Sequence, residues 1–304
     1  MIAPVYAGAE AVPPVAPVVL PDDEAVRSML LRMRVPASAV DEVLAARPAP
    51  GTAAWDRLEA KHRELVTRSK PLCWGPTPAD ATPVDRWLAL WTFVATVPHH
   101  LALDAARGVP EDVTWLTLGD IGDNIASRIS LEGRAGFDAF WFSYHLRGRI
   151  YRLGRLQFNV GRATIDSGPD APFVPGDPVL GVHIPMAGPL TPAACDDAFG
   201  RARDFFPRHV SDRHVPVGTC RSWLLDPVLA EYLPDDSNIV GFQRRFRLVA
   251  DWSLPGDDAI LHYVYGRPHA DPATLEPRSV LQEAIRDRLL AGDHFLVRRG
   301  WLRL

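Results

Sequence analysis

The apolar pattern of this sequence changes its period near Gly136, and this change constrains the fold more than any other feature. Before it, segments such as DDEAVRSMLLRM, which starts at Asp22, have acidic residues in the first turn and apolar residues at helical spacing. After it, aromatic and β-branched segments alternate with turns rich in glycine and proline, as strands do. Helices and strands that are segregated along a chain are typical of α+β proteins. We therefore predict a helical N-terminal part followed by a sheet flanked by helices.

Three stretches are expected along the chain. Residues 1–21 are rich in proline and lack the basic start of a secretory signal, so they are predicted to be a flexible lead. Residues 22–134 hold the predicted helical domain, and residues 135–304 hold the predicted sheet domain. A chain of 304 residues exceeds the usual size of a single core, which favours two domains.

The expected elements follow from caps, prolines and glycines. Helices of the first domain are predicted to start at Asp22, after Pro36, at Gly51, after Pro83 and at Asp112 or Thr114, the last one ending at Gly133. Next, FDAFWFSYHLRG and IYRLGRLQFNVGRAT are separated by Arg-Gly-Arg, which predicts a hairpin. Further strands are expected over 178–185, 218–226, 245–254, 259–266 and 294–304, and further helices over 191–206, 227–246 and 279–292.

Charge and composition exclude several classes of protein. A net charge of -4 provides no broad basic field for nucleic acid, although the cluster Arg244 to Arg247 can contact an anion locally. The apolar run WLALWTFVATV is too short to cross a membrane. Cys73, Cys195 and Cys220 form no CxxC pair, which favours buried thiols in a reducing compartment and a cytoplasmic location.

The segment GVHIPMAGPLTPAACDDAF joins a strand directly to a helix through a turn that contains glycine. Thr191 followed by Pro192 is a strong helix start, because the hydroxyl accepts an orphan N–H and proline fits the first helical position. The free N–H groups and positive end of such a helix can bind a phosphate, and Gly188 permits close approach of the backbone. An ordinary, well-capped connection explains the same residues.

Four segments carry a resemblance to a known family: YRLGRLQF, HIPMAGPLTPAACDDAF, CRSWLLDPVLAEYLPDDSNIVGFQRRFRLV and LLAGDHFLVRRGWL. They resemble a group of bacterial acyltransferase-domain proteins with a helical N-terminal part and a GNAT-like C-terminal domain. The resemblance covers most of the chain and implies a mixed, mostly antiparallel sheet. It also implies acyl-CoA as co-substrate, with its pyrophosphate at the turn after the central strand.

The resemblance assigns residues to the acyl-CoA site. Backbone amides of Met186, Ala187, Gly188, Leu190 and Thr191 are expected at the pyrophosphate, the amide near Ile184 at the thioester carbonyl, and Asn238 at the pantetheine arm. The sequence departs from the family pattern where Leu190 replaces a small residue and Pro189 supplies no N–H. Phe242 and Phe246 stand where the family often has a tyrosine that protonates the thiolate.

Acyl transfer needs a base for the attacking group and an acid for the leaving thiolate. His183 is the candidate base, because it ends the strand that runs beside the thioester in the family; a histidine bonded into the sheet is the alternative. Ser222 can orient a water or protonate the thiolate, or simply bond the backbone. Glu231, with Tyr232 beside it, is a further candidate.

We therefore expect an enzyme that moves an acyl group from acyl-CoA to a small-molecule or peptide amine by direct attack. The helical domain would shape the acceptor side. The alternative is a non-catalytic GNAT-like module that binds a metabolite or a protein, and a weaker one is a hydrolase that uses Cys220 or Ser222. No HExxH or HxxH motif predicts a metal site, and oligomeric state is left open.

Overall fold

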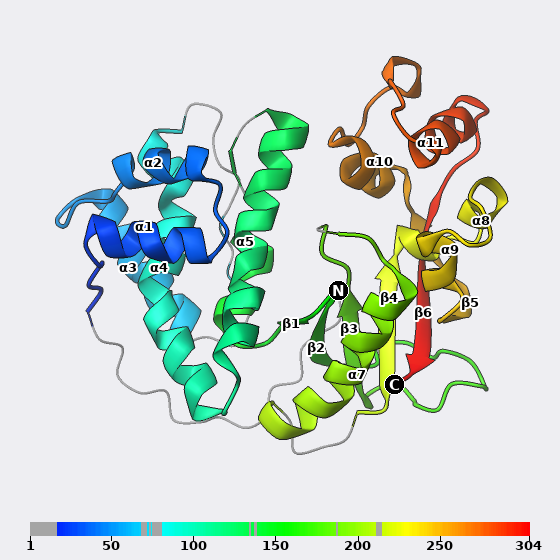
Figure 1. The fold of residues 1–304 in the computed structure, drawn as a ribbon, viewed down its shortest axis with the longest axis horizontal. Coiled ribbons are helices and arrows are strands. Elements are labelled where there is room, and N and C mark those ends of the chain that lie inside the picture. Colours follow the sequence, from blue (N-terminus) through cyan, green and yellow to red (C-terminus); the bar gives the residue numbers. More distant parts are fainter. Residues whose placement is uncertain are drawn as a thin grey trace. The chain divides into compact units, whose positions relative to one another are not determined.

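The computed structural model describes residues 17–67, 72, 74, 81–133, 135, 136, 139–186, 188–210 and 215–304. The chain divides between Arg152 and Leu153 into two compact units. We call the part before this point the helical unit and the part after it the sheet unit, and Figure 1 shows both. The boundary predicted from the sequence lies earlier in the chain, between residues 134 and 135.

The helical unit contains six helices among the described residues: α1 (Asp23–Arg32), α2 (Ala37–Ala45), α3 (Ala53–Thr67), α4 (Pro83–Ala106), α5 (Glu111–Glu132) and α6 (Ala139–Leu146). The helix α1 starts at Asp22 as expected, because Asp22 accepts from the Ala25 amide at 2.8 Å, and α4 is capped by Thr82, which accepts from the Asp85 amide at 3.1 Å. The predicted caps of α5 were wrong: its N-cap is Pro110, and the Thr114 hydroxyl donates to Asp104 instead.

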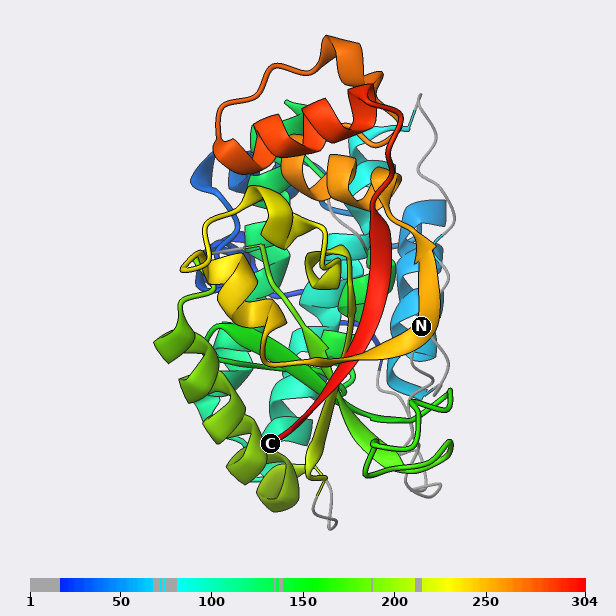
Figure 2. The same cartoon turned by 90° about the vertical axis from the view of Figure 1, so that its right-hand side faces the viewer.

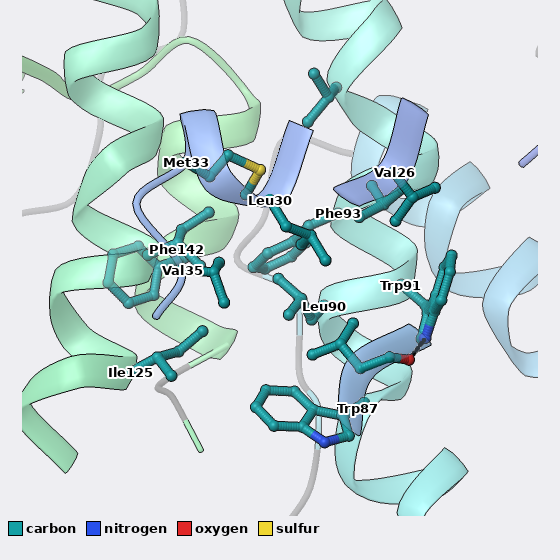
Figure 3. Close-up of a cluster of buried hydrophobic side chains, with 14 of the residues drawn as sticks. Val26, Leu30, Met33, Val35, Trp87, Leu90, Trp91, Phe93, Ile125 and Phe142 are labelled. Atoms are coloured by element: carbon teal, nitrogen blue, oxygen red, sulfur yellow. Dashed lines mark hydrogen bonds between the residues drawn. The ribbon is translucent and has the colours of Figure 1, made fainter. Parts of the chain in front are cut away.

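The core of the helical unit is built on the apolar run of α4. Trp87, Leu90 and Phe93 are fully buried and pack with residues of α1, α5 and α6. Figure 3 shows these side chains, with the Trp91 indole donating to the Val43 carbonyl at 3.0 Å. The run that is too short for a membrane is thus the centre of this core. No helix in the described ranges is both long and apolar enough to span a bilayer.

The helix α6 corrects the first half of the predicted hairpin, since Ala139–Leu146 is helical rather than extended. A short, continuously apolar run has no period that separates a helix from a strand. Phe142 and Leu146 lie one helical turn apart, and both are buried in the core of the helical unit. The hairpin lies later: β1 (Tyr151–Leu153) and β2 (Leu156–Arg162) flank Gly154, whose φ is 68°.

The sheet has six strands in the order β1-β2-β3-β4-β6-β5. The other strands are β3 (Pro178–His183), β4 (Val217–Ser222), β5 (Arg247–Pro255) and β6 (Leu296–Arg303). β3 and β4 are parallel, whereas the pairs β2–β3, β4–β6 and β5–β6 are antiparallel. This mixed, mostly antiparallel sheet with flanking helices confirms the expected α+β fold.

One face of the sheet is covered by α7 (Pro192–His209), as Figure 1 shows. Phe199 of this helix packs on Phe158 of β2, with ring centroids 5.8 Å apart. Since side chains alternate along a strand, the register places Val182 and Cys220 on this face, with Phe158. The same alternation places His183 and Thr219 on the opposite face.

The remaining elements lie around β5 and β6. They are the 3-10 turns Trp223–Leu225 and Pro272–Thr274 and the helices α8 (Leu229–Tyr232), α9 (Asn238–Gln243), α10 (Asp257–Tyr265) and α11 (Val280–Leu290). The helix α10 overturns the strand predicted over 259–266. This helix has two helix signals: Asp257 and Asp258 lie in its first turn, and Gly266 ends it. The prediction of a strand gave more weight to the β-branched and aromatic residues of the segment.

Candidate active site

The site is built where β3 and β4 part. Their parallel pairing runs through Leu180–Gly218 and Gly181–Thr219 and ends at Val182–Cys220. Both strands continue beyond this pair, to His183 and to Ser222. Beyond Val182 and Cys220 the two strands are no longer paired with each other, and we call this end of their ladder the opening. This opening lies at the carboxyl ends of the strands, where open sheets with crossover helices commonly bind ligands.

His183 lies at this opening with a defined tautomer. Its Nε2 is 2.7 Å from Oδ1 of Asn159, while Nδ2 of Asn159 donates to the Val160 carbonyl at 3.2 Å. The amide oxygen of Asn159 therefore accepts, and Nε2 of His183 carries the proton. The lone pair is then on Nδ1, as a proton acceptor requires. The structural alternative is thus seen directly, because His183 is bonded to Asn159 of the sheet, and its role as a base stays a prediction.

Ser222 lies on the other side of the sheet from His183. It shares the α7 face with Cys220, two residues earlier, and His183 follows Val182 onto the opposite face. The Ser222 hydroxyl accepts from the Leu224 amide at 3.1 Å and caps a 3-10 turn. The structure thus does not bring these two candidates together, and it gives Ser222 the backbone role that the sequence left open.

Cys220 is a buried thiol. Complete burial raises its pKa to about 12, so the thiol stays protonated at neutral pH. A thiolate nucleophile at this position is therefore disfavoured. Cys195 is also free and buried, and burial raises its pKa as well. Cys73 lies outside the described residues.

The third candidate, Glu231, is exposed on α8. Its side chain forms no hydrogen bond or ion pair with any residue that the structure describes. The hydroxyl of neighbouring Tyr232 accepts from Arg288 at 3.4 Å. Nothing in the geometry of α8 orients either residue toward the end of β3.

The turn after β3 is held by an arginine that the sequence analysis did not identify. Arg155 donates from Nη1 to the Pro185 carbonyl at 2.9 Å and from Nε to the Pro189 carbonyl at 3.1 Å. Gly188 is exposed with φ at 82°, and Leu190 is buried, so its larger side chain points away from solvent. Proline and leucine are therefore compatible with this turn. Ala187 lies outside the described residues.

Three backbone amides lie close together in sequence where the turn meets α7, and none of them has an acceptor among the described residues. The amides of Gly188, Leu190 and Thr191 donate to no other residue in the described part of the chain. The Thr191 hydroxyl accepts from the Ala194 amide at 3.3 Å and fixes the start of the helix, as predicted. Amides at a helix N-terminus that have no other acceptor are a suitable site for a phosphate group.

A second arginine adds positive charge at this end of α7. Arg245 donates from Nη2 to the Pro192 carbonyl at 3.1 Å and forms an ion pair with Asp196. Arg245 belongs to the basic cluster that was predicted from the sequence to contact an anion. Arg155 lies elsewhere, in the turn between β1 and β2. Sequence reasoning could have found Arg245 by its cluster, but nothing near Arg155 indicated its distant partners.

The other assigned residues lie around the opening with different exposure. Met186 is exposed, Ile184 is half-buried, and the amide of Ile184 has no acceptor among the described residues. Asn238 is the first residue of α9, where Ser237 provides the cap by accepting from the Val240 amide at 3.3 Å. Asn238 itself does not cap the helix, and its side chain remains a candidate for ligand contact.

Two phenylalanines occupy the region where a tyrosine was expected from the resemblance. Phe242 and Phe246 are buried and stack on each other at 5.1 Å. They are core residues and supply no proton. No group of three or more His, Cys, Asp or Glu side chains among the described residues is placed to hold a metal ion.

Solved structures of acyltransferases are similar to this chain over nearly its whole length. An acyltransferase in complex with decanoyl-CoA is 38% identical, with a TM-score of 0.85. A mutant acyltransferase with octanoyl-CoA and an acyltransferase with decanoyl-CoA and teicoplanin are each 37% identical, also with TM-scores of 0.85. Each alignment covers 96% of this chain and 91% of the other. A comparison with curated proteins found no match.

Two family models together account for almost the entire described chain. The N-acyltransferase N-terminal domain matches residues 24–148, and the GNAT-like C-terminal domain matches residues 150–302. The two matches correspond to the helical unit and the sheet unit. The chain therefore belongs to the GNAT-type N-acyltransferases.

Proposed function

We propose that this protein transfers an acyl group from acyl-CoA to the amine of a small-molecule or peptide acceptor, by direct attack. The observation that carries the proposal is the opening between β3 and β4, with His183 oriented by Asn159 at its edge. The relatives bind octanoyl-CoA, decanoyl-CoA and teicoplanin, which supports a medium-length acyl chain and an acceptor of similar kind. Free, buried thiols support a reducing compartment, the bacterial cytoplasm.

The pyrophosphate of acyl-CoA would bind at the start of α7. The amides of Gly188, Leu190 and Thr191 would be the donors, and the resemblance adds those of Met186 and Ala187. Arg155 holds the turn through its carbonyls, and Arg245 adds positive charge beside the helix end. Asn238 is available to the pantetheine arm.

His183 would act as the general base. Its Nδ1 takes a proton from the acceptor amine as the nitrogen attacks the thioester carbonyl. The amide of Ile184 supports the negative charge on the carbonyl oxygen. The C–N bond forms, the C–S bond breaks, and the electron pair leaves on the sulfur of CoA, which then takes up a proton. Ser222 faces away from His183, and Glu231 is not oriented toward the strand end, so neither is assigned this proton.

Thermal unfolding with added thioesters tests the binding step. A ligand that binds only the folded state raises Tm by mass action, so decanoyl-CoA at about 100 times its Kd should stabilise the protein by about 2.7 kcal/mol. We expect octanoyl- and decanoyl-CoA to raise Tm more than acetyl-CoA does. No shift with any thioester or with CoA would overturn the proposal.

Substitution of the base tests the chemical step. His183→Gln should lower kcat by about 10²- to 10⁴-fold while the Tm shift with decanoyl-CoA is kept. His294→Gln, at an exposed histidine that pairs with Asp257, is the matched control and should not change kcat. Equal turnover in the parent and the His183 variant would remove the catalytic assignment.

The alternative, a non-catalytic module, is favoured by one observation: Phe242 and Phe246 fill the place of the expected tyrosine. In that case thioesters would raise Tm, but no amine would be acylated by the parent protein. Mass spectrometry of a panel of amines incubated with decanoyl-CoA and the protein distinguishes the two functions.

A further inference from the structure

A buried arginine on the His183 face of the sheet lacks an acidic partner. Arg299 of β6 is only 9% exposed. Its Nη1 donates to the Thr164 hydroxyl at 3.0 Å, and no carboxylate of the described residues lies within ion-pair distance. Buried charges in proteins are almost always paired, because burial without a partner costs free energy. Burial lowers the pKa of Arg299, and so does the charge of neighbouring Arg221.

The strand β5 is distorted at the position of this arginine. Leu248 pairs with Gly300 and Ser253 pairs with Arg298, so the four residues from Val249 to Trp252 lie opposite Arg299 alone. Figure 2 shows β5 turning sharply as it passes β6. The bulge brings the Trp252 ring within 4.7 Å of the Arg299 guanidinium, which it covers. Bulges commonly redirect a side chain next to a functional site. Here the bulged segment supplies the aromatic ring that contacts the guanidinium.

A second polar group without a partner lines the same hollow. The hydroxyl of Thr219 is buried and forms no hydrogen bond with any described residue. Thr219 and Arg299 both line a small hollow that is partly open to solvent, with Thr164, Phe173 and Trp301 among its other walls. A planar guanidinium and a hydroxyl beside it are the donors that a carboxylate binds best.

The register relates this hollow to the opening. Arg221 follows Cys220 just as His183 follows Val182, so the two occupy equivalent places on the parallel strands and share a face. Arg221 pairs with Arg299 across β4 and β6. Arg299 thus lies two strands from the end of β3, and two steps of the usual spacing between paired strands are roughly 10 Å. The exposed Arg221 side chain, which also lacks a described acidic partner, lies between them.

We propose that this hollow binds a carboxylate of the acceptor, held by Arg299 and Thr219 while the acceptor amine lies at His183. This inference rests on the proposed function for the amine, but the anion site stands on its own geometry. The acceptor class is then an amino acid derivative or peptide whose acidic group is roughly 10 Å from its attacking nitrogen. An extended tripeptide spans this distance from its amine to its carboxylate.

Paired tripeptides provide the test. Tripeptides with a free C-terminal carboxylate and the same tripeptides as C-terminal amides are titrated into the CoA-loaded protein by calorimetry. The acid should bind about tenfold or more tightly than the amide, as expected for a buried charge-assisted contact. Arg299→Gln should remove this preference, and Arg299→Lys should restore little of it, because lysine lacks the planar fork. Arg303→Gln, on an exposed position of the same strand, is the matched control and should keep the full preference.

A second variant covers the case in which substitution of Arg299 disturbs the fold. Thr219→Val removes an unpaired buried hydroxyl, so the protein should stay folded while the preference for the acid falls several-fold. Equal binding of acid and amide by the parent, or no binding of either at millimolar concentration, overturns the inference. The titrations are repeated without CoA. A preference for the acid there, together with no Tm shift from any thioester, would support the anion site while the proposed acyl transfer failed.

Discussion

Two buried arginines, one in each unit, differ in how their charge is balanced. Arg152, the last residue of the helical unit, is 6% exposed, and its guanidinium contacts both Asp120 and Asp123. Arg299 of the sheet unit is buried to nearly the same degree and contacts a hydroxyl and an indole ring. Burial alone therefore does not distinguish the two, but the partners do. A charge whose counter-ions belong to the chain stabilises the fold, whereas one without them is available to a ligand.

The largest expected effect is on the balanced arginine. Arg152→Gln leaves Asp120 buried beside a neutral side chain, and breaking a buried pair in this way typically costs about 3–5 kcal/mol. The free energy of unfolding from urea denaturation measures the loss. Arg27→Gln, which breaks an exposed pair with Asp41, should cost at most about 1 kcal/mol. Equal losses in the two variants would contradict the comparison.

A second effect arises from a histidine in the helical unit. Burial lowers the pKa of His100 from 6.5 to about 4, against the opposing attraction of Asp104. Between these values the unfolded chain binds a proton that the folded chain does not, so stability falls as pH drops from 6.5 to 4, by about 3 kcal/mol.

The pH dependence of unfolding measures this loss against a variant. His100→Leu removes the titrating ring, so the difference in unfolding free energy between variant and parent should change through this pH range. Parallel curves for His100→Leu and the parent would show that the buried ring does not contribute.

A matched pair of threonines sharpens the contrast. The Thr114 hydroxyl donates to buried Asp104 at 2.7 Å, so Thr114→Val should cost about 1–3 kcal/mol. Thr219 has no described partner, and Thr219→Val should cost nothing or stabilise slightly. Tm values of the two variants provide the measurement. A large loss at Thr219 would mean that its hydroxyl supports the fold.

The smallest expected effect concerns two helix caps. Asp22→Ala in the helical unit and Thr191→Ala in the sheet unit should each cost about 1 kcal/mol. Only the second should also weaken binding of decanoyl-CoA, because Thr191 fixes the helix end that faces the proposed phosphate site. Equal thioester affinities for both variants would remove α7 from that site.

Local signals predicted much of the fold. Thr191 with Pro192, Ser279 and Gly133 mark helix ends that the structure confirms, because each acts through neighbouring backbone groups. The two errors of element type, α6 and α10, fall on short aromatic segments whose period is ambiguous. Their helical state depends on the surfaces that bury them, and these involve residues far away in sequence.

The site was less predictable for the same reason. His183 could be singled out from its place at a strand end, but its orientation depends on Asn159, and the turn after it depends on Arg155. These contacts bridge strands and loops whose pairing no local pattern reveals. The separation of His183 from Ser222 required the register of β3 and β4, since a shift by one residue exchanges the faces.

The parallel direction of β3 and β4 has a topological consequence. A chain that leaves one strand and enters its parallel neighbour must travel back along the sheet, and here α7 makes that return journey between His183 and Val217. The beginning of the returning helix therefore lies at the edge of the sheet where β3 ends. One continuous segment, from Pro178 to Ser222, thus fixes the place of the helix start relative to the strand ends.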